Sequence, residues 1–228
     1  MDVVYTNRDG ENPELRYSLR TLQNITYDEV WIFGGAPSWV NPGMVNFRRR
    51  MQLGSPYSST RAHIAAACNT MAVSDPFLLW NDDFYAMREI GEVPAMHRGS
   101  LSAMEERFST VKTLWAKGLR ETVSMIEKRG IVDPLSYDLH APLIVHKAPM
   151  LEALRWARES RTDATHLRTL YGNLANLRGV ETHDPKLTRK TDRFPVGPWL
   201  SSGDDTFRST VEPVLRYLFP DPSPYEKG

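Results

Sequence analysis

Cysteine is almost absent from the 228-residue chain, which contains only Cys68. One thiol cannot form a disulfide within the chain, and it cannot build a zinc site from several cysteines. Cys68 ends the segment AHIAAAC, whose apolar pattern is typical of a buried helix face. We therefore expect an inert, buried thiol.

Long apolar runs and net charge are also lacking. No run approaches the roughly 20 apolar residues that cross a bilayer, and Met1-Asp2 leads directly into a strand pattern instead of a signal peptide. Lys plus Arg equals Asp plus Glu at 28 each, so net charge predicts attraction neither to nucleic acids nor to membranes. These absences predict a soluble, cytoplasmic protein without a membrane span.

The first ninety residues alternate between strand and helix patterns. DVVYT (2–6) and EVWIFGG (29–35) are typical of strands, and Asn12-Pro13-Glu14 between them is typical of a helix start. A second helical stretch (59–73) precedes the apolar strand FLLW (77–80). Strands joined by helical crossovers pair in parallel. The predicted fold class is therefore α/β, with a Rossmann-type, mostly parallel sheet flanked by helices.

After Pro94 the pattern becomes helical and mixed. Residues 101–130 predict helix up to a C-cap at Gly130, and residues 136–147 predict a strand. Further helices are expected over 148–160, around Arg168 and over 211–218, followed by a proline-rich, non-helical tail. Because no repeat or low-complexity linker interrupts the chain, we expect one domain, residues 1–228, with halves 1–93 and 94–228.

The stretch FLLWNDDFYAM (77–87) places two adjacent carboxylates, Asp82 and Asp83, directly after a buried strand. Ionised carboxylates removed from water are costly unless they are paired, hydrogen-bonded or bound to a cation. In open α/β sheets, ligands bind beyond the carboxyl ends of the strands. A cation such as Mg²⁺ or Mn²⁺, which prefers oxygen ligands and shares them with substrate phosphates, would suit this position. A helix cap or plain loop is the alternative for so short an acidic turn.

Several motifs carry a resemblance to a known family. Asn81-Asp82-Asp83 resembles the DXD signature of GT-A-type nucleotide-sugar transferases, with Asn81 and Asp83 in its first and third positions. Blocks over nearly the whole chain resemble, in order, those of the Stealth family of sugar-phosphate transferases, which includes capsule-polymer enzymes and the lysosomal-enzyme N-acetylglucosamine phosphotransferase. The blocks are VVYTNRDGENP (3–13), ELRYSLRT (14–21), PSWVN (37–41), FLLWNDD (77–83), HAP (140–142) with Lys147, LRT (167–169), SGDD (202–205) and FPDPSPYE (219–226).

The chain also departs from the family pattern. Asn7 stands where the family has a Trp, and the segment 59–64 has lost an acid and gained Arg61. The fourth block keeps its acids, Asp204 and Asp205, but not the Phe-Cys and Asn around them. These departures affect the donor, the acceptor and the bond that is broken more than they affect the fold.

The resemblance implies a GT-A-like transferase that moves a sugar-1-phosphate from a UDP-linked sugar to an acceptor hydroxyl, with Mg²⁺ or Mn²⁺. A polysaccharide, a protein or a modified nucleobase could offer that hydroxyl. One alternative is a glycosyltransferase that moves the sugar itself. Another is a nucleotide-sugar-binding module without catalysis. In this scheme residues 1–93 form the nucleotide-binding half and 94–228 the acceptor and catalytic half.

The resemblance also assigns roles to single residues. The residues that would contact the donor are Tyr5, Thr6, Asn7, Asp9, Arg16, Asn81 and Asp82, and those that would hold the metal are Asp83 and Asp204. The catalytic group would comprise His140 as a base, because imidazole titrates near neutral pH, with Arg168 as a phosphate clamp and Asp205. The alternatives are a core aromatic for Tyr5, a satisfied buried histidine for His140 and a helix-surface arginine for Arg168. Either Asp204 or Asp205 could be a metal ligand or a base.

Overall fold

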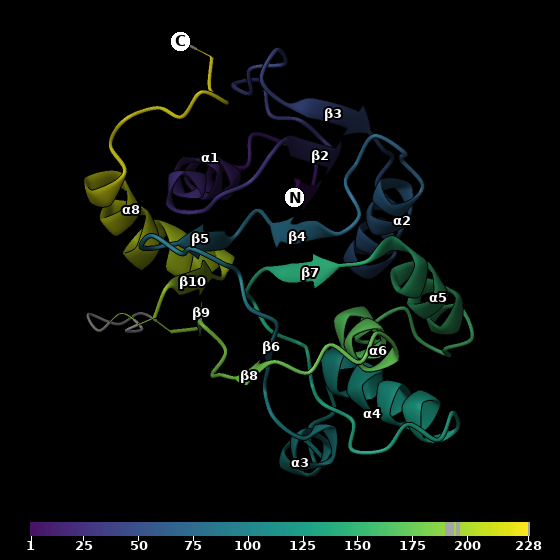
Figure 1. Ribbon diagram of the computed structural model, residues 1–228. Helices are drawn as coiled ribbons and strands as arrows, with labels where there is room; N and C mark the ends of the chain where they lie inside the picture. Colours follow the sequence, from purple (N-terminus) through teal and green to yellow (C-terminus); the bar gives the residue numbers. More distant parts are fainter. Residues whose placement is uncertain (190–193, 195–196, 228) are drawn as a thin grey trace.

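The computed structural model describes residues 1–189, 194 and 197–227, and its centre is a five-stranded sheet in the order β3-β2-β1-β4-β7 (Figure 1). Its strands are β1 (Val3–Asn7), β2 (Val30–Gly34), β3 (Asn46–Arg49), β4 (Phe77–Asn81) and β7 (Leu143–Val145). β1 pairs in parallel with β2 and β4, β3 continues in parallel beyond β2, and only β7 runs antiparallel to its neighbour. The predicted α/β class with a mostly parallel sheet is confirmed.

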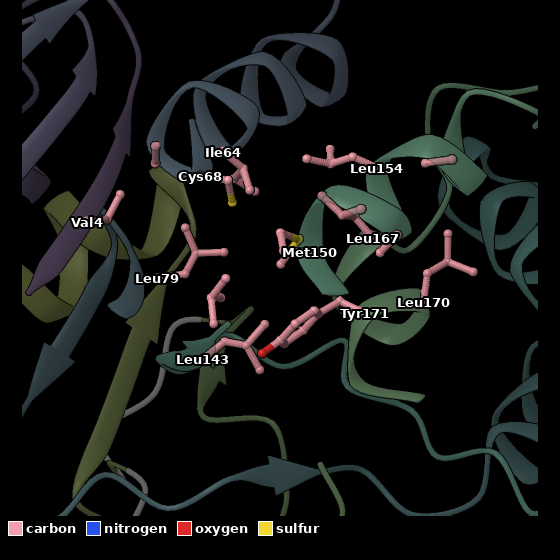
Figure 2. Packing of buried hydrophobic residues seen from close by; sticks show 14 of the residues in the cluster. Val4, Ile64, Cys68, Leu79, Leu143, Met150, Leu154, Leu167, Leu170 and Tyr171 are labelled. Carbon is pink, nitrogen blue, oxygen red and sulfur yellow. The ribbon is translucent and has the colours of Figure 1, made fainter. Parts of the chain in front are cut away.

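Both faces of this sheet are buried, which explains its nearly continuous apolar strands. Along β1, Val4 joins one core cluster, whereas Val3 and Tyr5 join the other, because successive side chains point to opposite faces. Four helices contribute to the first cluster, namely α2 (Pro56–Cys68), α4 (Leu114–Glu127), α5 (Lys147–Ala157) and α6 (Leu167–Leu174). Met150 and Leu79 lie close to α2 in this cluster (Figure 2). Helix α1 (Pro13–Thr21) packs on the opposite face. The thiol of Cys68 is buried and free, as predicted.

Eight α-helical segments surround the sheets in the described residues (Figure 1). They are α1 (Pro13–Thr21), α2 (Pro56–Cys68), α3 (Leu101–Arg107), α4 (Leu114–Glu127), α5 (Lys147–Ala157), α6 (Leu167–Leu174), α7 (Asp204–Thr206) and α8 (Glu212–Leu218). A π-helical turn (Phe207–Val211) joins the last two. The predicted start of α1 is confirmed, because the Asn12 side chain accepts a hydrogen bond from the Leu15 N–H at 3.3 Å. No helix in the described part of the chain has the length and apolar character to cross a membrane.

Three predicted elements differ in extent from those in the structure. The helix expected over 59–73 is α2, which begins at Pro56 and ends at Cys68. The helix expected over 101–130 is divided into α3 and α4, because Thr113 caps a new helix by accepting from the Ala116 N–H at 3.2 Å. Gly130 follows α4 with φ 65°, the left-handed conformation that a C-cap needs. The strand expected over 136–147 shrinks to β7, because Pro142 has no N–H and the carbonyls of Leu139 and Ala141 accept from Arg168 instead.

Two small sheets, which the sequence did not predict, lie beside the main one. β5 (Phe84–Ala86), β10 (Trp199–Ser202) and β9 (Lys186–Leu187) form the first, and β6 (Met96–His97) pairs with β8 (Val180–Glu181) in the second. β5 follows β4 after the Asp82-Asp83 turn, so β10 and β9 are brought next to that turn (Figure 1). A third apolar cluster packs α1 and β5 against the helical segment 204–218.

The proline-rich tail is not helical, as predicted, and runs from α8 back past α1 (Figure 1). Its carboxylate Glu226 accepts two hydrogen bonds from Arg20, at 2.7 and 2.9 Å. The carbonyl of Tyr225 accepts from the Asn41 N–H at 2.8 Å. The tail therefore joins α1 to the loop between β2 and β3.

Candidate functional site

A pocket of about 460 Å³ opens at the carboxyl edge of the main sheet. The pairing of Thr6 with Asn81 and of Asn7 with Gly34 aligns the ends of β1, β4 and β2 at this edge. We call this cavity the strand-end pocket. Of the residues proposed for the donor or the metal, those that line it are Thr6, Asn7, Asn81, Asp82, Asp83 and Asp204.

The acidic turn in this pocket is supported from below by a buried hydrogen-bond network. The Ser18 hydroxyl donates to the Phe84 carbonyl at 2.6 Å, and the Trp80 indole donates to the same carbonyl at 3.1 Å. Since the single Ser18 proton is used there, the Tyr5 hydroxyl donates to Ser18 Oγ at 3.0 Å. Tyr5 is fully buried under α1 and does not line the pocket. Its position is that of a core aromatic that supports the turn.

Asn12 links the start of α1 to the acidic turn. Its Nδ2 donates to Asn7 Oδ1 at 2.6 Å and to Asp82 Oδ2 at 2.5 Å, while its Oδ1 caps the helix. Asn7 Nδ2 in turn donates to the Gly35 carbonyl at 2.8 Å. The sequence identified Asn12 only as a helix cap, and its contact with a residue 70 positions later has no local signal.

Two protein cations reach the carboxylates of the pocket. Arg8 donates to Glu14 at 2.7 Å and lies 3.8 Å from Asp82 Oδ2 and 3.6 Å from Asp204 Oδ1. We call these four residues the Arg8 cluster.

Burial, together with the neighbouring Asp83, raises the pKa of Asp82 to about 7, although Asn12 and Arg8 oppose that rise. The carboxylate pair is therefore only partly compensated by the protein.

Asp83 is hydrogen-bonded to the small sheet formed by β5, β10 and β9. Its Oδ2 accepts from the Ser201 hydroxyl at 3.0 Å and from the Lys186 ammonium at 3.3 Å. Lys186 lies 103 residues away in sequence, so no local pattern could have identified it as part of the pocket. Arg8 and Lys186 together place positive charge on two sides of the acidic turn.

The oxygen atoms of the acidic turn could bind a cation that also binds the ligand. They could not supply a complete metal-coordination shell from the protein alone. The described residues contain no group of three or more His, Cys, Asp or Glu that could hold a metal ion. Mg²⁺, however, is often bound by only one or two carboxylates together with substrate phosphates. Asp82 and Asp83 both line the strand-end pocket and offer such oxygens.

His63 on α2 is a pocket residue that the sequence analysis did not select. It is buried, lines the strand-end pocket, and its Nε2 has no hydrogen-bond partner among the described residues. Burial lowers the pKa of His63, so the ring is neutral at pH 7. A Cβ added to Gly34 would lie 2.8 Å from His63 Cε1, so the two residues are packed closely. The only sequence signal was a histidine within the apolar helix AHIAAAC.

His140 precedes β7, which is antiparallel to β4 and begins near the carboxyl end of that strand, but it is not among the residues that line the strand-end pocket. Its Nδ1 is 3.0 Å from Asp184 Oδ2, and its backbone N–H donates to Asp184 Oδ1 at 3.1 Å. Burial raises the pKa of Asp184, but the hydrogen bonds from His140 and the charge of Arg98 outweigh this, so the net pKa is lowered and the group is ionised. With a proton on Nδ1, Nε2 of His140 is an acceptor.

Arg168 on α6 holds the segment that carries His140. Its Nη1 and Nη2 donate to the carbonyls of Leu139 and Ala141, and its guanidinium lies 5.5 Å from the centre of the Phe84 ring. Burial lowers the pKa of Arg168 to about 10. Arg168 is thus not on a helix surface, and its Nη groups are directed to the backbone and not into the strand-end pocket.

Three other residues proposed from the resemblance lie outside the strand-end pocket. Asp9 is exposed beside Gly35, and Arg16 stacks 4.8 Å from the centre of the Trp39 ring on the side of the C-terminal tail. Asp205 is exposed and lines a neighbouring hollow of about 440 Å³ that also contacts Arg8. Roles in catalysis or donor binding for these three stay predictions.

Comparison with known proteins finds similar solved structures but no sequence relatives. No family model matches the chain, and no curated protein matches it. The galactosyltransferase LgtC in complex with donor and acceptor sugar analogs has a TM-score of 0.49 and 14% identity, covering 98% of this chain and 96% of that chain. An active-site mutant of LgtC gives a TM-score of 0.44 and 14% identity over 79% of this chain and 72% of that chain.

The apo form of mouse xyloside xylosyltransferase 1 has a TM-score of 0.36 and 8% identity, covering 99% of this chain and 96% of that chain. Likenesses this distant assign no activity to the chain, and membership of the Stealth family stays a prediction. What the structure itself establishes is an α/β fold with an acidic pocket at the carboxyl edge of its parallel strands.

Proposed function

We propose that the protein is a nucleotide-sugar-dependent transferase that binds a donor diphosphate in the strand-end pocket and transfers a sugar-1-phosphate to an acceptor hydroxyl. The observation that carries this proposal is the placement of Arg8 beside Asp82 and of Lys186 beside Asp83 in the half-buried Asp82-Asp83 turn. Two cations and a carboxylate pair suit a pyrophosphate that arrives with a divalent ion, because the charges alternate across the site.

Different residues of the strand-end pocket would contact different parts of the donor. Arg8 and Lys186 would donate to phosphate oxygens, and His63 Nε2 would meet a polar group of the nucleotide or sugar. Asp82 and Asp83 would hold Mg²⁺ or Mn²⁺ together with the donor phosphates, whereas Asp204 lies 3.6 Å from Arg8. Such an ion would supply electrostatic stabilisation of the charge that develops on the leaving nucleotide.

His140 would act as the base, with Asp184 and Arg168 as the groups that position it. The acceptor hydroxyl gives its proton to His140 Nε2, its oxygen forms a bond to the β-phosphorus, and the bond from that phosphorus to the bridging oxygen breaks. UMP then leaves with the electron pair of the broken bond. Asp184 would fix the tautomer that leaves Nε2 unprotonated and stabilise the imidazolium that forms.

One observation favours the second candidate, transfer of the sugar itself. Both Nη groups of Arg168 donate to backbone carbonyls, so Arg168 is not placed as a phosphate clamp. In that reaction the hydroxyl attacks the anomeric carbon and UDP leaves. The same pocket and the same base would serve, and only the atom attacked differs.

Product analysis separates the candidates. The protein is incubated with a panel of UDP-sugars, labelled in the β-phosphate, with Mn²⁺ or Mg²⁺. Release of UMP with the label retained in the acceptor or in free sugar phosphate supports sugar-phosphate transfer, whereas release of UDP supports glycosyl transfer. Binding of UDP-sugars without any metal-dependent turnover would leave a non-catalytic binding module.

A substitution in the acidic turn tests the role of the carboxylates. Asp83→Asn is expected to abolish turnover and leave the far-UV circular dichroism spectrum unchanged, because the amide keeps the shape but loses the charge. Asp221→Asn, in the exposed tail, is the matched control and should turn over normally. Normal turnover by Asp83→Asn would contradict the proposed site.

A further inference from the structure

A second cavity, of about 270 Å³, adjoins the strand-end pocket. The two cavities share three lining residues, Pro56, Thr60 and Asn81. The walls of the second cavity come from α2, the beginning of α4 and the segment that leads into α6. We call it the Trp115 pocket. A ligand in it would lie next to a donor bound in the first pocket, with Asn81 between them.

Two residues that line the Trp115 pocket each have a buried polar atom without a hydrogen-bond partner among the described residues, namely His166 Nδ1 and Arg168 Nε. His166 is only 6% exposed. A buried polar group without a partner is costly, so these two atoms call for a partner from a bound molecule or from water.

The hydrogen bonds around His166 define what that molecule must offer. Its Nε2 is 3.1 Å from the Trp115 carbonyl, which can only accept, so Nε2 carries a proton and donates it there. Nδ1 lies 3.6 Å from Asp138 Oδ2. The partly exposed Asp138 carboxylate can accept a further hydrogen bond, and a ligand hydroxyl supplies the donor. Arg168 Nε, in contrast, needs an acceptor, which a second hydroxyl supplies.

Aromatic rings complete the pocket. Trp115 donates from its indole N–H to Asp138 at 2.8 Å, which fixes the ring, and Tyr57 lines the same cavity from α2. The Asp138 side chain is 24% exposed and retains capacity to accept from a ligand. An aromatic surface beside a carboxylate, a guanidinium and an amide matches a pyranose, which has apolar C–H faces and a rim of hydroxyls that both donate and accept.

We propose that the Trp115 pocket binds a neutral sugar ring of the acceptor. The volume suits one monosaccharide ring, and the shared residue Asn81 lets one hydroxyl of that ring reach the strand-end pocket. That this sugar ring belongs to the acceptor rests on the proposed function. The binding of a sugar ring in the Trp115 pocket does not. Among the possible acceptors, this favours a carbohydrate over a protein side chain or a nucleobase.

Indole resonances test this directly. The chain has six tryptophans, of which only Trp115 is among the residues lining this pocket. In ¹⁵N-labelled protein, Trp115→Phe assigns the Trp115 indole signal, and methyl glycosides of glucose, galactose and N-acetylglucosamine are then titrated with and without UDP. At least one glycoside is expected to shift that signal in a saturable way. UDP binding is measured separately by calorimetry.

Two variants measure the contribution of the pocket walls. Asp138→Asn should weaken glycoside binding roughly tenfold or more, the effect of a hydrogen bond to a charged group. Tyr57→Ala, at a half-buried position, should weaken it without a change in the core. Asp221→Asn, at an exposed position of the tail, is the control and should bind as the unaltered protein does.

The outcomes are distinguishable. If UDP binds but no glycoside moves the Trp115 signal, the sugar pocket is wrong and the proposed donor site stands. If uridine or thymidine moves that signal and the glycosides do not, the pocket takes a nucleobase and the inference is overturned. If a glycoside binds in the Trp115 pocket and UDP does not bind at all, the inference stands and the proposed function fails.

Discussion

Glu226, near the end of the chain, should contribute more to stability than an ordinary surface acid. Its side chain is 5% exposed and its partner Arg20 is 9% exposed, and two hydrogen bonds at 2.7 and 2.9 Å join them. The Ser223 N–H donates to the same carboxylate at 2.9 Å. In Glu226→Gln the charge is lost, and Arg20 stays buried without a counter-ion.

The expected cost follows from this burial. Breaking a buried ion pair by removing one partner destabilises a protein by about 3–5 kcal/mol. For a chain of this size, each kcal/mol lowers Tm by about 2–4 °C, so Glu226→Gln should lower Tm by at least roughly 6 °C. The matched control is Glu212→Gln, because Glu212 pairs with exposed Arg216 on α8 at 2.6 Å. An exposed pair on a helix contributes little to stability, so Tm should change little.

The pH dependence gives a second test of the same contact. Burial raises the pKa of Glu226, but the hydrogen bonds from Arg20 and the Ser223 N–H outweigh it and the net pKa is lowered. A carboxylate with a lowered folded pKa stabilises the fold above its unfolded pKa of about 4.3, and that stability is lost as the pH falls through the folded pKa. In urea unfolding, the unaltered protein should therefore have a higher free energy of unfolding than Glu226→Gln at pH 7. The difference should shrink in stronger acid. Equal stability of Glu226→Gln and Glu212→Gln at pH 7 would refute the reasoning.

Three further substitutions test the site and its support. Asp184→Asn should lower kcat about 10²–10⁴-fold, the usual contribution of a positioned base, with little change in the KM for the donor. Asp184→Glu should restore part of the lost activity. An unchanged kcat would remove the positioning role. Arg8→Met should weaken UDP binding about tenfold in calorimetry, because a phosphate loses a cation, and unchanged affinity would place the diphosphate elsewhere. Gly34→Ala should cost more than about 2 kcal/mol in urea unfolding, because φ is 122° and the new Cβ would lie 2.0 Å from the Asn7 carbonyl oxygen. Gly91→Ala, where nothing lies within 4 Å, is its control and should be almost neutral.

The main sheet could be predicted because its strands are apolar runs that end at polar residues. Asn81 and Asp82 meet Thr6 and Asn7 once parallel pairing is assumed, so convergence at one edge followed from the order of the elements. The edge strand β3 could not be predicted, because its four residues, NFRR, lack an apolar run. The two-residue strands β6, β8 and β9 are too short to give any periodic pattern.

The partners of the site residues could not be predicted for a different reason. Asp184 is 44 residues from His140, and Lys186 is 103 residues from Asp83. Neither pair has a spacing that local propensity or periodicity can detect. Tyr5 shows the opposite case, because strand alternation alone puts it on the same face as Val3, under α1. Its role beneath the acidic turn became visible only with the Ser18 network.

Lys186 on β9 and Ser201 on β10 both hydrogen-bond to Asp83. These contacts couple ligand binding to the stability of the three-stranded sheet. Because Lys186 and Ser201 belong to those strands, any diphosphate that contacts Lys186 spends part of its binding energy holding them in register. By mass action the effect is reciprocal, since whatever loosens the strands also weakens the ligand. The amides of β9 and β10 should therefore exchange with deuterium more slowly once a nucleotide is present, although they lie outside the five-stranded sheet.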